Sequence, residues 1–388
     1  IEGSTYLGEL AGKPKQRESL LGLLRSVRAI KRVFGKVHVN FGQPLALAGF
    51  LDQHQPGWRD TDESDEPPWA RSVTRRAAAE LAKRINEAAV LNPVNLMALA
   101  LLATPKHTAD EHALQRMIEH YQALAGELPY APSSVPCGLG PPAIIAYNER
   151  LTVVERFADP LGDLIRVRDG QAPLLAYFRN NVLHLFALPA VIACLLSLNR
   201  KLDRARVAQA VRGICGLMRA ELFLRWSTDE LESASAAAIR VLVARRLLVS
   251  SARETEVAAP EAISDEFAEL HLLGETIRPL LERHFLTLAL LQSHGSGQTT
   301  RRQLEDNCHL LAQRLSLLYE FNTSELPEKA TFSAFIGNLI EAEYLREDED
   351  DRLCFDERLM TPLAHSELVL SPEARQAIRR IAGAGAHL

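Results

Sequence analysis

The chain has 388 residues, of which 47% are hydrophobic, and this predicts a folded protein of about two to three domains. A mean hydropathy of −0.06 argues against several membrane spans, and a formal net charge of −5 gives no overall field to attract nucleic acid or anionic lipid. The five cysteines are few and widely spaced, which favours a reducing compartment over a disulfide framework or a zinc site.

The first 35 residues are basic and rich in turn formers at "GKPKQRES", and a helix is predicted through "LLGLLRSVRAIKRVFG". Because Ile1 takes the place of an initiator Met, we expect the chain to be a piece of a longer protein. Lys13, Lys15 and Arg17 lie in the Gly/Pro turn. They are candidates for a phosphate contact, and a solvated loop is the alternative interpretation.

Residues 36–41, "KVHVNF", predict a strand with one buried face, because Val37, Val39 and Phe41 alternate with polar residues. Gly42 and Pro44 close the strand as turn residues. The acidic, proline-tipped stretch "RDTDESDEPP" that follows cannot pack a core and is predicted to be a solvated linker.

From about residue 73 onward the pattern is mostly helical, which predicts a mainly α fold with short β-hairpins. Three helices are expected to begin at Ser/Thr-x-x-Glu/Gln capping boxes, which satisfy free backbone donors. The boxes are Thr108 with Glu111, Ser227 with Glu230, and Thr300 with Gln303. Short β-like runs are found at 151–155, 164–168, 247–251 and 351–356.

Two stretches near 182–251 and 284–356 share a pattern of helix, turn, two further helices and a short extended pair. We therefore expect two like-shaped helical units within a helical region spanning 71–388. The same order of elements builds winged-helix modules, so nucleic-acid binding is an alternative function. The acidic net charge and the lack of a sustained Lys/Arg helix face weigh against it. A helical scaffold without enzymatic activity is a further alternative.

Residues 180–199 contain no Asp, Glu, Lys or Arg. A buried core helix is the favoured interpretation, and contact with a bilayer surface or a true span are the alternatives. Near 107–112, two histidines flank Asp110 and Glu111 and resemble a metal-ligand cluster. A helix N-terminus is favoured there instead, because acidic residues suit that end of the helix dipole.

No known catalytic motif is complete in this sequence. No histidine is followed by Asp five positions later, which is the spacing that would let a carboxylate orient a basic histidine. The GxSxG, GxxxxGK[ST], GxGxxG and HExxH patterns are also absent.

Four separated stretches, in this order, resemble the membrane-associated bacterial glycerol-3-phosphate 1-O-acyltransferases. They are "YLGELAGKPKQRESLLGLLR", "VHVNFGQPLAL", "YFRNNVLHLFALPAVIA" and "MRAELFLRW". The resemblance implies that residues 1–70 end an α/β acyltransferase domain and that 71–388 form its helical C-terminal domain. It also implies that the family's His-x4-Asp catalytic block lies outside this chain, so no residue here is expected to be catalytic.

What the resemblance assigns to this chain is limited. It implies that Phe41, Gly42, Pro44 and Leu45 belong to the acyl-donor pocket, and that Lys13 and Lys15 help to bind phosphate. The implied partners are glycerol 3-phosphate, acyl-CoA or acyl carrier protein, and a membrane surface, with no nucleic acid, metal or further cofactor. The implied location is the cytoplasmic face of the bacterial inner membrane. A strand ending in Gly and Pro can provide a rigid apolar edge for an acyl chain, whereas a strand-to-turn corner in an α/β core is the alternative.

Overall fold

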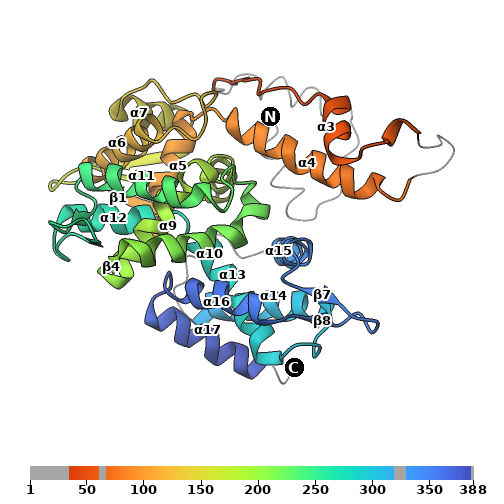
Figure 1. The fold of residues 1–388 in the computed structure, drawn as a ribbon. Coiled ribbons are helices and arrows are strands. Elements are labelled where there is room, and N and C mark those ends of the chain that lie inside the picture. The colour runs from red at the N-terminus through yellow and green to blue at the C-terminus, as the bar shows by residue number, and fades with distance from the viewer. Residues whose placement is uncertain (1–34, 61–66, 319–328, 386–388) are drawn as a thin grey trace, which may run out of the picture.

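The computed structural model describes residues 35–60, 67–318 and 329–385. These residues form mainly α-helices with a few small antiparallel sheets, which confirms the predicted mainly α class. Figure 1 shows three groups of helices stacked along the molecule, with α3 and α4 extending to one side. The division proposed at residue 70 stays a prediction.

The predicted strand over 36–41 is wrong, because residues 35–46 are extended and are not paired in any sheet of the described chain. The side chains of Val37, Val39 and Phe41 are 89%, 74% and 87% exposed instead of forming a buried face. A strand needs a hydrogen-bonding neighbour, and the described residues supply none here. We refer to residues 35–46 as the strap.

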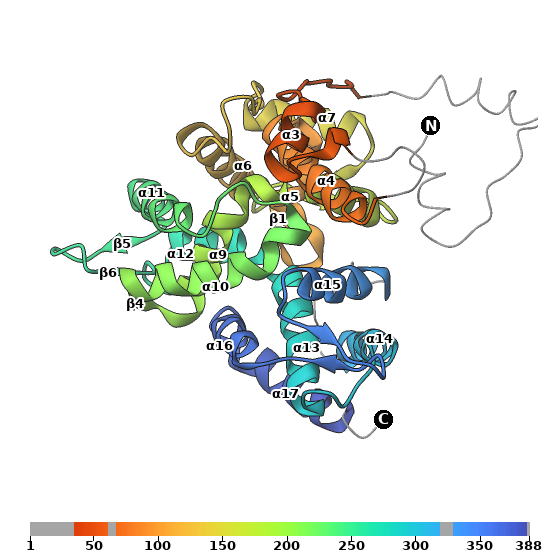
Figure 2. The same ribbon diagram turned by 45° about the vertical axis from the view of Figure 1, so that its right-hand side comes forward.

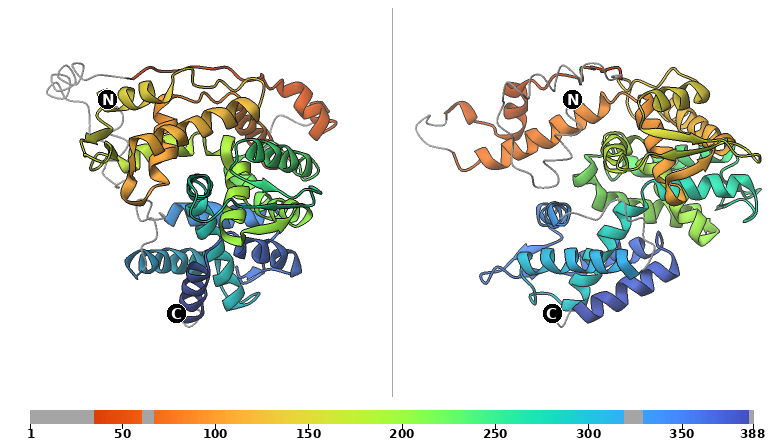
Figure 3. Two further views of the ribbon diagram at one scale, coloured as in Figure 1. Left: turned by 90° about the vertical axis from the view of Figure 1, so that its left-hand side faces the viewer. Right: turned by 180° about the vertical axis from the view of Figure 1, so that it is seen from behind.

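The strap leads into the short helices α3 (Leu47–His54) and η1 (Trp58–Asp60) and the long helix α4 (Ala70–Glu87). Phe50 and Leu51 on α3 pack with Val73 on α4 in a small cluster separate from the main core. Val73 is the one buried residue that α4 contributes among the described residues. Accordingly, α4 reaches away from the body of the molecule, as seen from behind in Figure 3.

The order helix, strand, helix, helix, strand, strand occurs twice among the described residues, and a third unit repeats it without the first strand. Unit 1 consists of α5 (Pro93–Leu102), β1 (Thr108–Asp110), α6 (Glu111–Glu127), α7 (Pro141–Arg150), β2 (Val154–Phe157) and β3 (Leu164–Val167). Unit 2 consists of α9 (Leu183–Asn199), β4 (Lys201–Asp203), α10 (Arg204–Leu222), α11 (Glu230–Ala244), β5 (Val249–Ser250) and β6 (Glu256–Ala258). Unit 3 consists of α13 (Arg278–His294), α14 (Arg301–Leu318), α15 (Lys329–Glu341), β7 (Arg346–Glu347) and β8 (Leu353–Cys354).

The strands of units 1 and 2 pair in the same order, and those of unit 3 form a reduced version of it. In units 1 and 2 the last strand lies between the other two, giving the orders β1-β3-β2 and β4-β6-β5. In unit 3, β7 pairs with β8, and an isolated antiparallel bridge from Thr300 to Arg352 replaces the first strand. This is the winged-helix order, and the hairpin of unit 2 projects from the body in Figure 2. The sequence pattern predicted two such units, and the structure adds a third at 93–167.

The remaining described elements lie within unit 1, between the units and after the last one, and they complete the helical body. They are η2 (Pro105–His107), α8 (Ala172–Asn180), α12 (Asp265–Glu275), η4 (Glu357–Leu359), α16 (Met360–Glu367) and α17 (Pro372–Gly385). Helix α12 crosses α9 so closely that a Cβ atom at Gly274 would lie 2.9 Å from the backbone of Cys194. Glycine is therefore required at this crossing.

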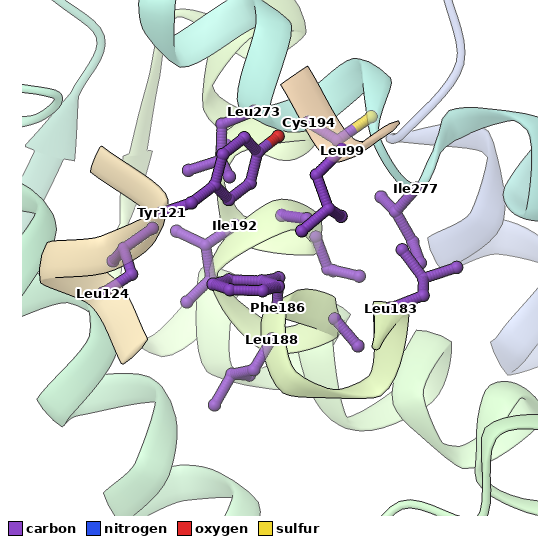
Figure 4. Close-up of a cluster of buried hydrophobic side chains, with 14 of the residues drawn as sticks. Leu99, Tyr121, Leu124, Leu183, Phe186, Leu188, Ile192, Cys194, Leu273 and Ile277 are labelled. Atoms are coloured by element: carbon purple, nitrogen blue, oxygen red, sulfur yellow. The ribbon is translucent and has the colours of Figure 1, made fainter. Parts of the chain in front are cut away.

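The apolar run over 180–199 is a core helix, as the sequence analysis favoured. Most of α9 is buried, and Figure 4 shows Phe186, Leu188 and Ile192 packed in the central cluster. The rings of Phe186 and Tyr121 meet edge to face at 5.0 Å. No single helix among the described residues has the length and hydropathy to cross a membrane, although α8 and α9 together do, with a 91° bend between them.

Two of the three predicted capping boxes are confirmed, and the third is wrong. The backbone N–H of Ser227 donates to Glu230, and that of Thr300 to Gln303, at 2.7 and 3.0 Å. At α6, however, the capping side chain is Asp110, which accepts hydrogen bonds from the backbone of His112 and Ala113. Thr108 lies in β1 because pairing with β3 extends the backbone there.

Candidate functional site

A groove with a volume of about 1910 Å³ lies between the strap and helices α4, α7 and α8. Two of the stretches that carry the family resemblance line it together. The strap contributes His38, Asn40 and Gly42, and the stretch at 177–184 contributes Asn181 and His184. Because these stretches are about 140 residues apart in the sequence, only the fold brings them together.

The start and the middle of the strap are fixed by specific contacts. The backbone N–H of Lys36 donates to the Tyr147 hydroxyl at 2.8 Å, and a Cβ atom at Gly35 would lie 2.8 Å from that hydroxyl. The amide of Asn40 donates to the backbone oxygens of Ala88 and Ser133, at 2.9 and 2.8 Å. The strap is therefore held by hydrogen bonds rather than by apolar burial.

The end of α4 links the groove to unit 2. The side-chain amide of Asn86 donates to the backbone oxygen of Leu222 at 2.8 Å, within the fourth stretch of the resemblance. The backbone oxygen of Asn86 accepts from Nε2 of His184 at 3.1 Å. The ring of Tyr130 lies 5.0 Å from His184 and 5.1 Å from Trp226, edge to face in both cases. Three of the four stretches thus meet at one end of the groove.

The structure places the four residues predicted for the acyl-donor pocket in different surroundings. Gly42 lines the groove, and a Cβ atom there would lie 2.7 Å from the backbone oxygen of Arg84. The backbone oxygen of Pro44 accepts a hydrogen bond from the Arg84 guanidinium. Leu45 packs on the cluster of α3 and α4, whereas the Phe41 side chain is exposed. Their role toward an acyl donor stays a prediction, and Lys13 and Lys15 lie outside the described residues.

The sequence analysis missed several residues that shape the groove. Tyr147, Asn86 and Arg150 lie in stretches that it treated only as helix. Six asparagines line the groove, and two of them form the adjacent pair at 180–181. This cluster of amides on otherwise apolar helices could have indicated the groove from the sequence, because amides next to an apolar surface usually mark a polar contact.

No cluster of three or more His, Cys, Asp or Glu residues that could hold a metal ion occurs within the described ranges. The histidines and acids near 107–112 are explained by the start of α6, as the sequence analysis favoured. Asp110 caps the helix, and Glu111 pairs with the guanidinium of Arg156. That pairing, together with the bond from Gln115, lowers the pKa of Glu111.

Comparison with known proteins identifies the class. The model for the glycerol-3-phosphate acyltransferase C-terminal region matches residues 6–348. Glycerol-3-phosphate acyltransferases of Pseudomonas paraeruginosa and Pseudomonas aeruginosa are 40% identical to the chain over 387 residues, and that of Pseudomonas putida is 39% identical over 388. Each match covers 98% of this chain, which spans 46% of the length of each relative.

These matches place the chain among proteins named for acyl transfer. It belongs to the glycerol-3-phosphate acyltransferase family and corresponds to the C-terminal region of that family.

Proposed function

We propose that the chain is the C-terminal part of an enzyme that transfers a fatty acyl group to the sn-1 hydroxyl of glycerol 3-phosphate. The donor would be acyl-CoA or acyl carrier protein, the product lysophosphatidic acid, and the location the cytoplasmic face of the bacterial inner membrane. Family membership over residues 6–348 is the observation that carries this proposal. The meeting of three resembling stretches at one groove supports it.

In this proposal the reacting groups lie outside the chain. Removal of the hydroxyl proton needs a base, and no histidine here has the family's catalytic spacing. Phe41, Gly42, Pro44 and Leu45 would form part of a wall near the donor. Lys13 and Lys15 would assist phosphate binding, and the two substrates would react without a further cofactor.

The winged-helix topology does not by itself indicate nucleic-acid binding, because one fold serves many functions. In such modules the third helix usually enters the major groove. Here the third helices α7, α11 and α15 each carry one basic residue, namely Arg150, Arg240 and Lys329. Helix α11 also has Glu230 and Glu232 in its first turn. We therefore propose that the units are structural and do not bind nucleic acid.

Two acyltransfer assays with labelled glycerol 3-phosphate and palmitoyl-CoA test the function. The purified 388-residue chain should give no product above a no-protein control, whereas a longer protein that contains these residues and a His-x4-Asp block should give lysophosphatidic acid. Acyl transfer by the 388-residue chain that persists after further purification would contradict the proposal that the reacting groups lie outside it. An inactive longer protein that is folded and membrane-bound would contradict the function.

A further inference from the structure

The described lining of the groove carries no negative charge. About one residue in eight of the whole chain is Asp or Glu, yet none of the described residues lining the groove is acidic. The lining instead includes the cationic side chains of Lys36, Arg84 and Arg150 and many amides. A concave surface lined by charge of one sign attracts ligands of the opposite sign.

Two of these cationic residues contact Tyr147, Lys36 through its backbone and Arg150 through its guanidinium. The backbone N–H of Lys36 is bonded to the Tyr147 hydroxyl, and the guanidinium carbon of Arg150 lies 5.6 Å from the centre of the Tyr147 ring. No ion pair with Lys36 or Arg150 is found in the described part of the chain. By contrast, Arg84 is occupied, because its Nε atom lies 2.9 Å from Glu80. Within the described ranges, Lys36 and Arg150 are therefore available to an anion.

The acidic neighbour of Arg150 is held elsewhere. Glu149 lies 2.7 Å from Nε of Arg156, which also binds Glu111 and Asp163. These carboxylates raise the pKa of Arg156, so its guanidinium stays charged and keeps Glu149 engaged. Glu149 consequently does not neutralise the groove next to Tyr147.

Part of the groove lining is apolar. Ile85 and Leu81 on α4 are 71% and 45% exposed, and Tyr177 on α8 is 42% exposed. Leu174, also on α8, lines the groove as well. The volume exceeds the roughly 300–1,000 Å³ of compact small-molecule pockets, which suits an elongated ligand with one charged end.

We propose that this groove binds a phosphate ester attached to an elongated chain. The phosphate lies between Lys36 and Arg150 at Tyr147, and the chain runs along Leu81, Ile85 and Tyr177. Two sources share this chemistry: the phosphopantetheine arm of an acyl donor and the headgroup of an acylated glycerol phosphate. Both sources rest on the proposed function, the first as its donor and the second as its product.

Isothermal titration of the full 388-residue chain tests the site with four probes: 4′-phosphopantetheine, pantetheine, dodecyl phosphate and inorganic phosphate. At least one phosphorylated chain should bind ten-fold or more tightly than inorganic phosphate, and more weakly as salt rises. Lys36→Gln with Arg150→Gln should weaken that binding at least ten-fold. Arg206→Gln removes an exposed cation of α10 outside the groove and should leave the binding unchanged.

The outcomes separate the two sources and the two proposals. Preference for 4′-phosphopantetheine over pantetheine assigns the groove to the donor arm, and preference for dodecyl phosphate assigns it to a lipid phosphate. The site is overturned if no phosphorylated chain binds more tightly than inorganic phosphate. It is also overturned if Arg206→Gln weakens binding as much as the Lys36→Gln and Arg150→Gln double variant. Because these titrations need no turnover, they can fail while the longer protein still transfers acyl groups.

Discussion

His184 shows at the scale of one residue how a groove position becomes sensitive to pH. Its side chain is 3% exposed, and Nε2 donates to the backbone oxygen of Asn86. Burial lowers the pKa of His184 from 6.5 to about 4, and the hydrogen bond offsets only part of that shift. The folded protein therefore holds this imidazole uncharged at neutral pH.

The sign of the resulting pH dependence follows from proton uptake. Below about pH 6.5 the unfolded chain protonates this histidine while the folded chain does not, so the free energy of unfolding falls as the pH drops toward 4. His184 should lower it by about 2 kcal/mol between pH 7 and pH 5. Urea unfolding at the two pH values measures the change.

Two variants isolate the contribution of His184. His184→Gln retains a donor for Asn86 but cannot gain a proton, so its loss of stability between pH 7 and pH 5 should be about 2 kcal/mol smaller than that of the wild type. His112→Gln, which removes an exposed imidazole on α6, should behave like the wild type. Identical pH dependence in both variants would contradict a buried, uncharged His184.

At the scale of elements, the same turn ends the third helix of every unit. The second residue after α7, α11 and α15 has a positive φ, at Thr152, Arg246 and Glu343. The residue that follows donates its N–H to a backbone oxygen five positions earlier, as from Leu247 to Leu242. This is the Schellman arrangement, which satisfies free carbonyl groups at a helix end.

Glycine suits this turn better than the residues present. Arg246 has a φ of 61° and is exposed, so Arg246→Gly should raise the free energy of unfolding by about 0.5–1 kcal/mol. Arg240→Gly, at an exposed position inside α11, should lower it by about 1 kcal/mol. Urea unfolding compares the two. A loss of stability in both variants would show that the Arg246 side chain has a role that outweighs its backbone strain.

At the scale of the whole molecule, Glu269 joins unit 1 to the helix between units 2 and 3. This carboxylate of α12 lies 2.6 Å from Nε of Arg116 and 2.7 Å from Nε2 of His120, both on α6. Burial alone would raise the pKa of Glu269, but the bonds from His120 and Arg116 lower it. Nδ1 of His120 lies 3.4 Å from the guanidinium of Arg245, which extends the network into unit 2.

Removing the bridging carboxylate should loosen the packing of the units. Glu269→Ala leaves the buried His120 without this acceptor and Arg116 with Asp265 as its remaining partner, and it should lower the free energy of unfolding by about 2–3 kcal/mol. Asp265→Ala removes a second ion pair of Arg116, in which the Asp265 side chain is 79% exposed. This substitution should lower the free energy of unfolding by less than about 1 kcal/mol. Differential scanning calorimetry would show the difference, and equal losses would contradict a central role for Glu269.

The sequence by itself determined features that depend on neighbouring residues. Capping boxes at Ser227 and Thr300, the core helix at 183–199 and the mainly α class follow from local hydrogen bonding and hydrophobic spacing. The four stretches also sufficed to recognise the family. Each of these signals is contained within a short segment, so no knowledge of distant contacts was needed.

Tertiary structure alone decided what depends on distant partners. The strand over 36–41 was predicted from its alternating pattern, but the pattern does not supply a paired neighbour, and the strap is held instead by Asn40 and Tyr147. The first unit was missed because its opening helix is only ten residues long. The units are recognised by the order in which their strands pair, and that order is a tertiary property. The groove has the same origin, because its cations come from the strap, α4 and α7, and its amides from segments that meet only after folding.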